Sequence, residues 1–586
     1  MCGIFGYIGK RINAAELVFD GIKTLEYRGY DSWGVAAISK NNIFVQKQIG
    51  KIGDAKLHKS PLSSLAIAHT RWATHGGVTK ENAHPHLDCT KSIAIIHNGI
   101  IENYDTLKKQ LHNKHTFLSE TDSEVAVHMI EEKMHAMPFS EAVRMTFLAC
   151  SGSNALVAIQ QATNEIVAIR SGSPLVVGYG DNEQFIASDA AGLLPYTKKV
   201  HYLEDNEMAI LTKNSIQIVD IQTNAKKKIV PTILTWTRAA ATKAGFDTYM
   251  EKEIHEQTNI IYTLAKQTTY ATQLAHAIQT ARGAYLTGCG SAYYACLAGT
   301  YLFSTIAKRH INAMVASEFT FQEDFINDKS LVIALSQSGE TMDIIDAVKR
   351  AKSKRATIAS IVNVEGSTLW RLSDLPIPCG AGPEIAVAST KDLTAKLAHL
   401  ILTAYASIDK QNEGTIVLTK TQKEIARILA PSSQQKLLNI AQILCHTNHL
   451  FVVGRGLSYP AALEIAIKIK EITYIHAEGL AAGELKHGTI ALIEKGTPCI
   501  VIAPNDETYG ANIAAAMELA ARGAIIIGIS RTQHEVFDQY IEVKDCGPAT
   551  IIPTIVAGQL LALTIATKKG LDPDKPRNLA KSVTVK

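Results

Sequence analysis

The stretch SLVIALSQSGETMDIIDAVKRA, residues 330–351, indicates the fold class of the second half of the chain. It begins with a nearly continuous apolar run, passes through a loop of Ser, Gln, Gly and Thr, and ends with helical periodicity. A buried strand that leads through a polar loop into an amphipathic helix is typical of a parallel α/β sheet. Hydroxyls and N–H groups at the helix start suit a phosphate, although an ordinary helix cap explains an isolated loop equally well.

The same strand–loop–helix pattern occurs twice. AYLTGCGSAYYACLAG near residue 290 is similar to LFVVGRGLSYPAALEI near residue 456. Three later pairs share one constant offset: Thr341 with Thr508, Arg355 with Arg522, and Cys379 with Cys546. We therefore expect two copies of one doubly wound α/β unit, at residues 248–410 and 411–575, followed by a tail at 576–586.

Residues 2–235 have a different pattern. Short β-rich runs such as SIAIIHNGII and EIVAIR alternate with turns, which predicts stacked sheets with helices packed outside them. The small, polar and basic segment WTRAAATKAGF then predicts a linker, at residues 236–247, between the two halves.

Composition narrows the class of protein. The 586 residues include 59 Lys and Arg against 55 Asp and Glu, and the two signs are interspersed, so nucleic acid is not an expected partner. The nine cysteines are scattered without a CxxC pair, which favours a reduced, cytoplasmic protein. No secretory signal and no apolar segment of roughly 20 residues is evident, so a membrane is not an expected partner either.

Polar motifs broken by glycine fill the first half. They are LEYRGYDS (25–32), AHTRWATHG (68–76), NAHPH (82–86), HNGIIEN (97–103) and SETDSE (119–124). Together with Cys2 they resemble the glutaminase domain of class II amidotransferases, a branch of the N-terminal nucleophile hydrolases. The resemblance implies an α+β sandwich of αββα layers, and L-glutamine as a substrate.

Position in these motifs implies a role for each residue. Cys2 would be the nucleophile, with its own α-amine as base once Met1 is removed. Asn98 and Gly99 would form the oxyanion hole. The residues that would bind glutamine are Arg71, Trp72, Thr74, His75 and Asp122.

A group of histidines in this half suggests a metal site at first sight. Its members are His69, His75, His84, His86 and His97. No acidic residue or cysteine stands at ligand spacing to them, so structural or substrate-contacting histidines are the better interpretation. The resemblance implies no metal and no other cofactor.

The repeated half resembles the sugar isomerase (SIS) module. The loop in 330–351, with GCGSAYY (288–294) and EIAVASTK (384–391), is most similar to the isomerase half of the glutamine:fructose-6-phosphate aminotransferase family. The residues that would bind sugar phosphate are Ser291, Ser336, Gln337, Ser338, Thr341, Val387 and Ser389.

The catalytic residues implied for this half lie in IKIKEITYIHAEGLAAGELKHG (467–488) and the tail NLAKSVTVK (578–586). Glu471 would move the proton between sugar carbons, and Lys468 shares its helix face, although a surface ion pair would explain those two alone. His487 would open the sugar ring, and Lys581 would form a Schiff base.

The resemblance implies glutamine-dependent conversion of fructose 6-phosphate to glucosamine 6-phosphate by a homodimer. Two alternatives stay open: action on another ketose phosphate, as an amidotransferase or deglycase, and a non-catalytic sugar-phosphate sensor. The chain departs from the family pattern at Trp33, Ala292 and Lys586.

Overall fold

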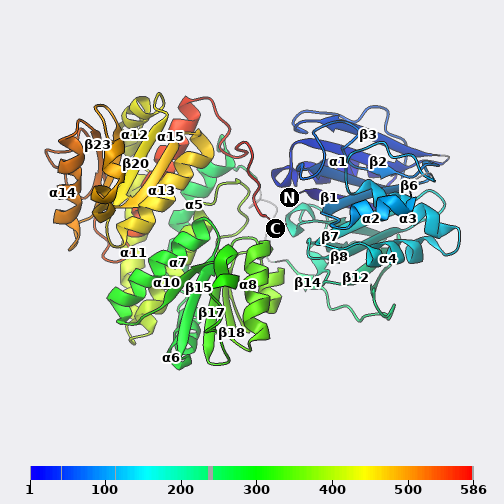
Figure 1. Ribbon diagram of the computed structural model, residues 1–586, viewed down its shortest axis with the longest axis horizontal. Helices are drawn as coiled ribbons and strands as arrows, with labels where there is room; N and C mark the ends of the chain where they lie inside the picture. The colour runs from blue at the N-terminus through cyan, green and yellow to red at the C-terminus, as the bar shows by residue number, and fades with distance from the viewer. Residues whose placement is uncertain (1, 41, 112–113, 235–241, 584–586) are drawn as a thin grey trace. The chain divides into compact units, whose positions relative to one another are not determined.

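The computed structural model describes residues 2–40, 42–111, 114–234 and 242–583, coloured along the chain in Figure 1. Contacts divide the chain into a first unit, residues 1–241 with 340–342 and 580–586, and a second unit, residues 242–339 with 343–579. Part of the predicted linker, residues 236–241, and Lys586 lie outside the described residues.

The first unit contains two antiparallel sheets. The larger has the order β14-β11-β9-β10-β1-β4-β2-β3 and the smaller has the order β13-β12-β8-β7-β6-β5. The strands of the larger sheet are β1 (Gly3–Gly9), β2 (Ser32–Ile38), β3 (Ile43–Ile49), β4 (Leu65–Arg71), β9 (Val176–Tyr179), β10 (Glu183–Ala187), β11 (Lys199–Tyr202) and β14 (Thr232–Ile233). Those of the smaller sheet are β5 (His86–Leu87), β6 (Ile93–Gly99), β7 (Asn154–Gln160), β8 (Ile166–Ser171), β12 (Glu207–Leu211) and β13 (Ile216–Asp220).

Helices cover the outer faces of these sheets, α1 on the larger and the others on the smaller. They are α1 (Ala14–Lys23), α2 (Tyr104–Leu111), α3 (Glu124–Met134) and α4 (Phe139–Ala149), with short turns η1 (Glu26–Arg28) and η2 (Ala190–Gly192). Strand β6 shows how the layers form. Ala94 and Ile96 pack between the sheets, whereas Ile93 and Ile95 pack against the helices, because successive side chains of a strand point to opposite faces. The predicted αββα sandwich is confirmed.

The second unit contains two five-stranded parallel sheets with equivalent strand orders, β16-β15-β17-β18-β19 and β21-β20-β22-β23-β24. The first sheet comprises β15 (Gly283–Gly288), β16 (Asn312–Val315), β17 (Ser330–Ser336), β18 (Thr357–Val362) and β19 (Leu375–Pro378). The second comprises β20 (His449–Gly454), β21 (His476–Ala481), β22 (Pro498–Ala503), β23 (Ile525–Ser530) and β24 (Gln539–Glu542). The predicted repeat of a doubly wound unit is confirmed.

Helices of the second unit pack partly in one core that joins both sheets and partly in a separate core on each sheet. In the first repeat they are α5 (Tyr249–Leu264), α6 (Thr269–Thr280), α7 (Ser291–Leu302), α8 (Met342–Ser353), α9 (Thr368–Leu372) and α10 (Lys391–Ala406), with η4 (Phe303–Ala307) and η5 (Ala316–Phe321). In the second they are α11 (Gln411–Ile428), α12 (Pro431–Leu444), α13 (Ser458–Thr473), α14 (Tyr509–Ala520) and α15 (Ile551–Lys568), with η6 (Ala482–His487) and η7 (Thr489–Leu492).

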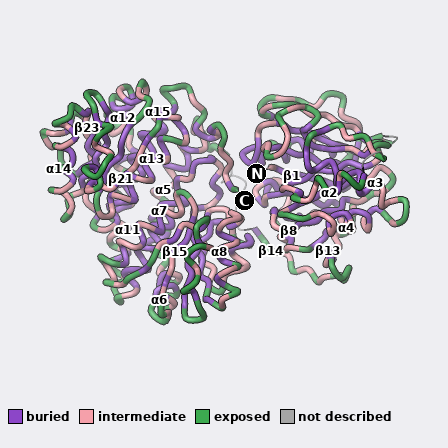
Figure 2. The backbone as a smooth tube through the Cα atoms, in the orientation of Figure 1, coloured by how far each residue is buried: buried purple, intermediate pink, exposed green. Residues whose placement is uncertain are grey.

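Helix α15 corrects one expectation from the sequence. In the described part of the chain, the segment Gly547–Lys568 is long and apolar enough to cross a membrane, but 89% of its apolar window is buried inside the protein. A Cβ on Gly558 would lie 2.3 Å from Ile465 Cγ1, so glycine lets α15 approach α13 closely. This helix is therefore part of the core, and Figure 2 shows the same pattern of buried strands and helices beneath exposed loops.

Candidate active sites

Cys2 lies directly before β1, in the middle of the larger sheet of the first unit. Its sulfur accepts a hydrogen bond from the Trp72 backbone N–H at 3.2 Å. Burial raises the pKa of the Cys2 thiol, although the Trp72 N–H and the Arg71 guanidinium favour the thiolate. The thiol therefore needs a base to become a nucleophile at neutral pH.

The orientation of Asn98 is determined by a buried histidine. His69 Nε2 lies 3.0 Å from Asn98 Oδ1, and burial lowers the pKa of His69 to about 3, so the ring is neutral. Because Oδ1 only accepts, His69 donates from Nε2 and the Asn98 amide nitrogen turns toward Cys2, whose carbonyl it contacts at 2.9 Å. The second N–H of this amide is suited to an oxyanion.

Gly99, at the end of β6, has a conformation that requires glycine. Its φ is +127°, and a Cβ there would lie 2.0 Å from the Ser153 carbonyl oxygen. The predicted pair Asn98 and Gly99 thus lies at the end of one strand, where Asn98 contacts Cys2.

The Arg71 guanidinium organises the loop that follows β4. It donates to the carbonyl oxygens of Gly77 at 2.9 Å and Gly76 at 3.1 Å, and also to that of His75. The His75 ring packs edge-on against Tyr104, with centroids 4.6 Å apart.

The other predicted glutamine-binding residues are spread over neighbouring loops. Trp72 packs edge-on against Tyr30, with ring centroids 5.7 Å apart, and Thr74 is exposed. Asp122 Oδ2 accepts the backbone N–H of Ile101 at 2.7 Å. By contrast, Trp33 packs against Phe19 of α1, so this departure is accommodated in the core.

The phosphate loop predicted in the second half joins β17 to α8. Ser336 ends the strand, and its hydroxyl accepts the N–H of Gly339 at 3.0 Å. Gly339 has φ +65°, and a Cβ there would lie 2.0 Å from Ser367 Oγ. Gln337, Ser338 and Thr341 are half-buried along this tight turn.

The predicted sugar contacts Val387 and Ser389 lie in a loop held by hydrogen bonds to Asp574 and Glu384. The Val387 N–H donates to the Asp574 carbonyl at 3.0 Å, and Asp574 also accepts the N–H groups of Tyr249 and Met250 at the start of α5. Asp574 was missed from the sequence, because no neighbouring residue indicates that it contacts the start of α5.

Three charged residues follow one face of α13. Lys468 Nζ lies 2.5 Å from Glu471 Oε2 and 3.6 Å from Glu464 Oε1. Burial raises the pKa of Glu464 to about 7, which Lys468 opposes. Burial alone would lower the pKa of Lys468, but the carboxylates of Glu471 and Glu464 outweigh it and raise the pKa. Lys468 is thus a cation held between two carboxylates.

Glu464 was missed from the sequence, although its spacing of four residues from Lys468 was a usable signal. Ser291 begins α7, followed there by Ala292, and its side chain favours the ionised form of Glu464. His487, by contrast, is exposed at the end of η6.

Lys581 falls in the first unit, where the nearby Val583 carbonyl accepts the N–H of Met342 at 3.0 Å. Glu471 and His487 fall in the second unit.

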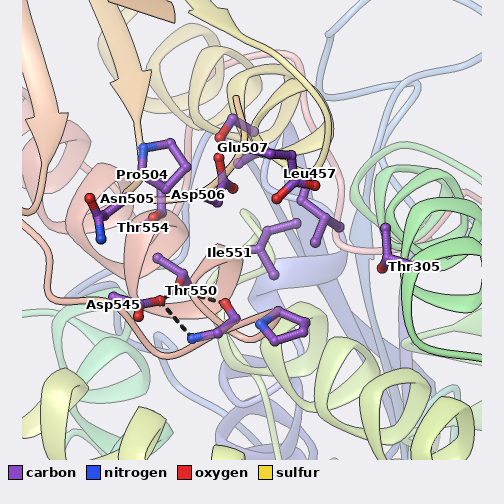
Figure 3. Close-up of a pocket in the computed structure, with 14 residues that line it drawn as sticks. Thr305, Leu457, Pro504, Asn505, Asp506, Glu507, Asp545, Thr550, Ile551 and Thr554 are labelled. Atoms are coloured by element: carbon purple, nitrogen blue, oxygen red, sulfur yellow. Dashed lines mark hydrogen bonds between the residues drawn. The ribbon is translucent and has the colours of Figure 1, made fainter. Parts of the chain in front are cut away.

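A pocket of about 300 Å³ lies in the second repeat, and Figure 3 shows its labelled residues. Polar side chains from the loop after β22 and the turn before α15 line it: Asn505, Asp506, Glu507, Asp545 and Thr550. Its carboxylates make it a poor place for a phosphate.

Comparison with known proteins agrees with both halves. The family model described as a glutamine amidotransferase domain matches residues 69–195, and the SIS domain model matches residues 277–406 and 443–563. Two relatives are named glutamine–fructose-6-phosphate aminotransferase (isomerizing). The protein from Pyrococcus horikoshii is 43% identical and that from Thermococcus kodakarensis 42%, each over 100% of both chains.

Solved structures resemble the second half. The C-terminal domain of glucosamine-fructose-6-phosphate aminotransferase from Francisella tularensis has a TM-score of 0.51 and 30% identity, and covers 57% of this chain and 99% of that one. Tagatose-6-phosphate ketose/aldose isomerase from Escherichia coli, at 17% identity and a TM-score of 0.50, covers 57% of this chain and 97% of that one and shares the fold. With relatives above 40% identity over the full length, this chain belongs to the glutamine–fructose-6-phosphate aminotransferase (isomerizing) family.

Proposed function

We propose that this chain transfers the amide nitrogen of glutamine to fructose 6-phosphate and isomerises the product to glucosamine 6-phosphate. The observation that carries the proposal is the full-length similarity to two relatives of that name, in a chain that contains both a Cys2 site and a repeated SIS unit. The overall reaction balances as glutamine plus fructose 6-phosphate giving glutamate plus glucosamine 6-phosphate.

In the first site, Cys2 attacks the side-chain amide carbon of glutamine. The Cys2 α-amine, free once Met1 is removed, takes the thiol proton, and Asn98 and Gly99 stabilise the oxyanion. Ammonia leaves, and water hydrolyses the thioester to glutamate. Arg71 and Asp122 bind the α-carboxylate and α-ammonium groups of the substrate. The hydrogen bonds from His69 to Asn98 and from Asn98 to Cys2 support this assignment.

In the second site, the loop Ser336 to Thr341 binds the 6-phosphate, and His487 opens the sugar ring. Lys581 forms an imine at C2, which ammonia displaces to give fructosimine and free lysine. Glu471 removes a proton from C1 and returns one to C2, so that a carbonyl forms at C1 and an amine remains at C2. Lys468 Nζ lies 2.5 Å from Glu471 Oε2 and holds this carboxylate in place.

The test is to incubate the purified chain with glutamine and fructose 6-phosphate, then assay hexosamine and glutamate together. The proposal expects equal amounts of both. Hexosamine only from another ketose phosphate, or sugar binding without any product, would contradict it. Cys2→Ala is expected to lose glutamine hydrolysis, and a fully active enzyme that retains Met1 would exclude the α-amine as base.

The assignment of Lys581 has a separate test. Borohydride added with fructose 6-phosphate is expected to fix the sugar on Lys581, and an adduct on Lys468 would overturn the assignment. Lys581→Arg is expected to abolish hexosamine synthesis and preserve glutamine hydrolysis, because arginine stays protonated and forms no imine. Lys575→Arg, directly before this tail, is the control and is expected to keep both activities.

Family resemblance also leads us to expect a cytoplasmic homodimer that uses no nucleic acid or membrane partner. The burial of α15 and the nine free cysteines are consistent with a soluble, reduced protein. Light scattering during size-exclusion chromatography tests the dimer, and a monomer that is fully active would contradict it.

A further inference from the structure

Four side chains that metals bind come together in the first unit, outside the glutaminase site. They are Cys89, His115, His128 and Glu131, and their ligand atoms all lie within 4.8 Å of one another. Cys89 follows β5, His115 precedes α3, and His128 and Glu131 lie one turn apart on α3. Residues from three separate segments thus converge on one point.

Four of the six distances between these atoms are close to the edges of a zinc tetrahedron. Cys89 Sγ lies 3.5 Å from His115 Nδ1 and 3.7 Å from His128 Nδ1. Zn–S and Zn–N bonds of about 2.3 and 2.05 Å at tetrahedral angles give an S–N edge of about 3.6 Å. Glu131 Oε2 lies 3.0 and 3.2 Å from the same nitrogens, near the roughly 3.3 Å expected for an N–O edge.

The far nitrogens of both rings provide a second, independent observation. His115 Nε2 lies 3.2 Å from Glu132 Oε2, and His128 Nε2 lies 3.7 Å from Glu124 Oε1. Both rings therefore turn Nδ1 to the cluster and Nε2 to a carboxylate. Histidines that bind metals almost always donate their other N–H to a carboxylate, carbonyl or water, as His115 does to Glu132. The 3.7 Å between His128 Nε2 and Glu124 Oε1 is an ion-pair distance rather than a hydrogen bond. The His128 side chain is only 1% exposed, so its orientation is tightly defined.

Hydrogen bonding alone is a poor explanation of this arrangement. Glu131 Oε2 faces both Nδ1 atoms and also accepts the Cys89 backbone N–H at 3.1 Å. The Cys89 thiol is a further, weak donor close to the same oxygen atom. The carboxylates of Glu124, Glu131 and Glu132 surround the two rings. A divalent cation would offset this charge and would bind the Cys89 thiolate.

We propose that Cys89, His115, His128 and Glu131 bind one zinc ion, with the loss of the thiol proton. Four protein ligands complete a tetrahedron and leave no open position, so the site is structural rather than catalytic. The expectation of no metal rested on cysteine and histidine spacing and on the family resemblance, and sequence spacing does not show that these four residues meet.

Zinc at this position would stabilise the segment from His115 to His128, which contains Asp122. Glu124 accepts the N–H groups of Leu118 at 2.8 Å and Ser119 at 2.7 Å, while it also faces His128. His115 and His128 lie on either side of Asp122 in sequence. The ion would therefore fasten this segment at both ends and to the turn after β5.

The test uses the full chain, stripped with a chelator, dialysed and reloaded with zinc chloride or cobalt chloride. We expect one zinc per chain after gel filtration. The cobalt form is expected to show the intense visible bands of a tetrahedral ion and a thiolate charge-transfer band. Less than stoichiometric zinc, or a cobalt spectrum without the thiolate band, would overturn the proposal.

Variants locate the ion. Cys89→Ser is expected to abolish the thiolate band and most zinc retention, whereas Cys150→Ser, in the same domain, is the control and is expected to change neither. Glu132→Gln removes only a carboxylate behind His115 and is expected to weaken zinc affinity roughly 10- to 100-fold while the domain still folds. Equal zinc affinity in wild type, Cys89→Ser and Glu132→Gln would place the metal elsewhere and would contradict the proposal.

Discussion

The two α/β repeats have the same strand order, yet the loops after their equivalent strands β17 and β22 differ. In the first repeat this loop reads SQSGET, residues 336–341, and in the second it reads APNDET, residues 503–508. Both lead into a helix through a threonine, Thr341 or Thr508. The first loop is rich in hydroxyls, whereas the second contains an additional carboxylate.

The additional carboxylate binds Thr508, the residue that precedes its own helix. Asp506 Oδ1 accepts the backbone N–H of Thr508 at 2.8 Å and its hydroxyl at 2.6 Å. An internal anion thus uses the donors that would otherwise attract phosphate at the start of α14. The neighbouring pocket in Figure 3 adds Glu507 and Asp545, which would repel phosphate further.

The residues proposed for phosphate binding and for proton transfer lie in different repeats. The first repeat carries the proposed phosphate loop, and the second carries Lys468 and Glu471 on α13, where the first repeat has Ser291-led helix α7. Under the proposed assignment, equivalent folds supply phosphate binding in one copy and proton transfer in the other. The predictions below test that division, from the largest expected effect to the smallest.

Glu471→Gln is expected to have the largest effect. The amide keeps the shape but cannot accept a proton, so hexosamine kcat should fall roughly 10²- to 10⁴-fold while sugar binding persists. Coupled assay of glucosamine 6-phosphate and equilibrium binding of fructose 6-phosphate measure the two effects. Glu494→Gln, an exposed carboxylate of the same repeat, should leave both unchanged. A near wild-type kcat in Glu471→Gln would assign the proton transfer to another residue.

Ser338→Ala is expected to weaken sugar binding selectively. A hydrogen bond to a charged group contributes about 1.5–3 kcal/mol, so the KM for fructose 6-phosphate should rise about 10- to 100-fold with little change in kcat. The position at the same offset in the second repeat is Asn505, and Asn505→Ala should change KM less than about twofold. If both variants raise KM alike, the two repeats do not divide binding in the way proposed.

Much of the difference between the two repeats could be predicted from the sequence because it depends on local patterns. The repeat is visible in glycines and loop residues at constant spacing, and the strand–loop–helix order follows from apolar periodicity. The strands of the first unit alternate in the same readable way, as Ile93 to Ile96 illustrate. Such features need only a few neighbouring residues.

Contacts between residues far apart in the sequence could not be predicted from it. Asp574 caps α5, more than three hundred residues earlier, and Cys89 meets His128 only after three segments have folded together. The buried charge of Glu464 was missed because a helix face alone does not reveal which side meets the core. Its effect on stability is measurable.

Glu464→Gln should change how stability depends on pH. Burial raises the folded-state pKa of Glu464 to about 7 from 4.5, so between these values the folded protein holds the proton more tightly than the unfolded chain. Unfolding free energy should therefore fall as pH rises through this window, by at most about 1.4 kcal/mol per pH unit. Lys468 narrows this pH window because it lowers the pKa of Glu464, whereas Glu471 widens it. Calorimetry of the second unit at several pH values should show a flatter profile for Glu464→Gln, and an unchanged slope would contradict this origin.

Asp506→Ala should have the smallest effect, and on stability alone. The variant removes the carboxylate that holds Thr508 at the start of α14, a loss typical of helix caps at about 1 kcal/mol. Because the second loop is not proposed to bind phosphate, the KM for fructose 6-phosphate should stay within about twofold of wild type. The melting temperature and the steady-state KM are measured on the same preparation. A large rise in KM with an unchanged melting temperature would reverse the assignment, because it would make the acidic loop a sugar contact rather than a helix cap.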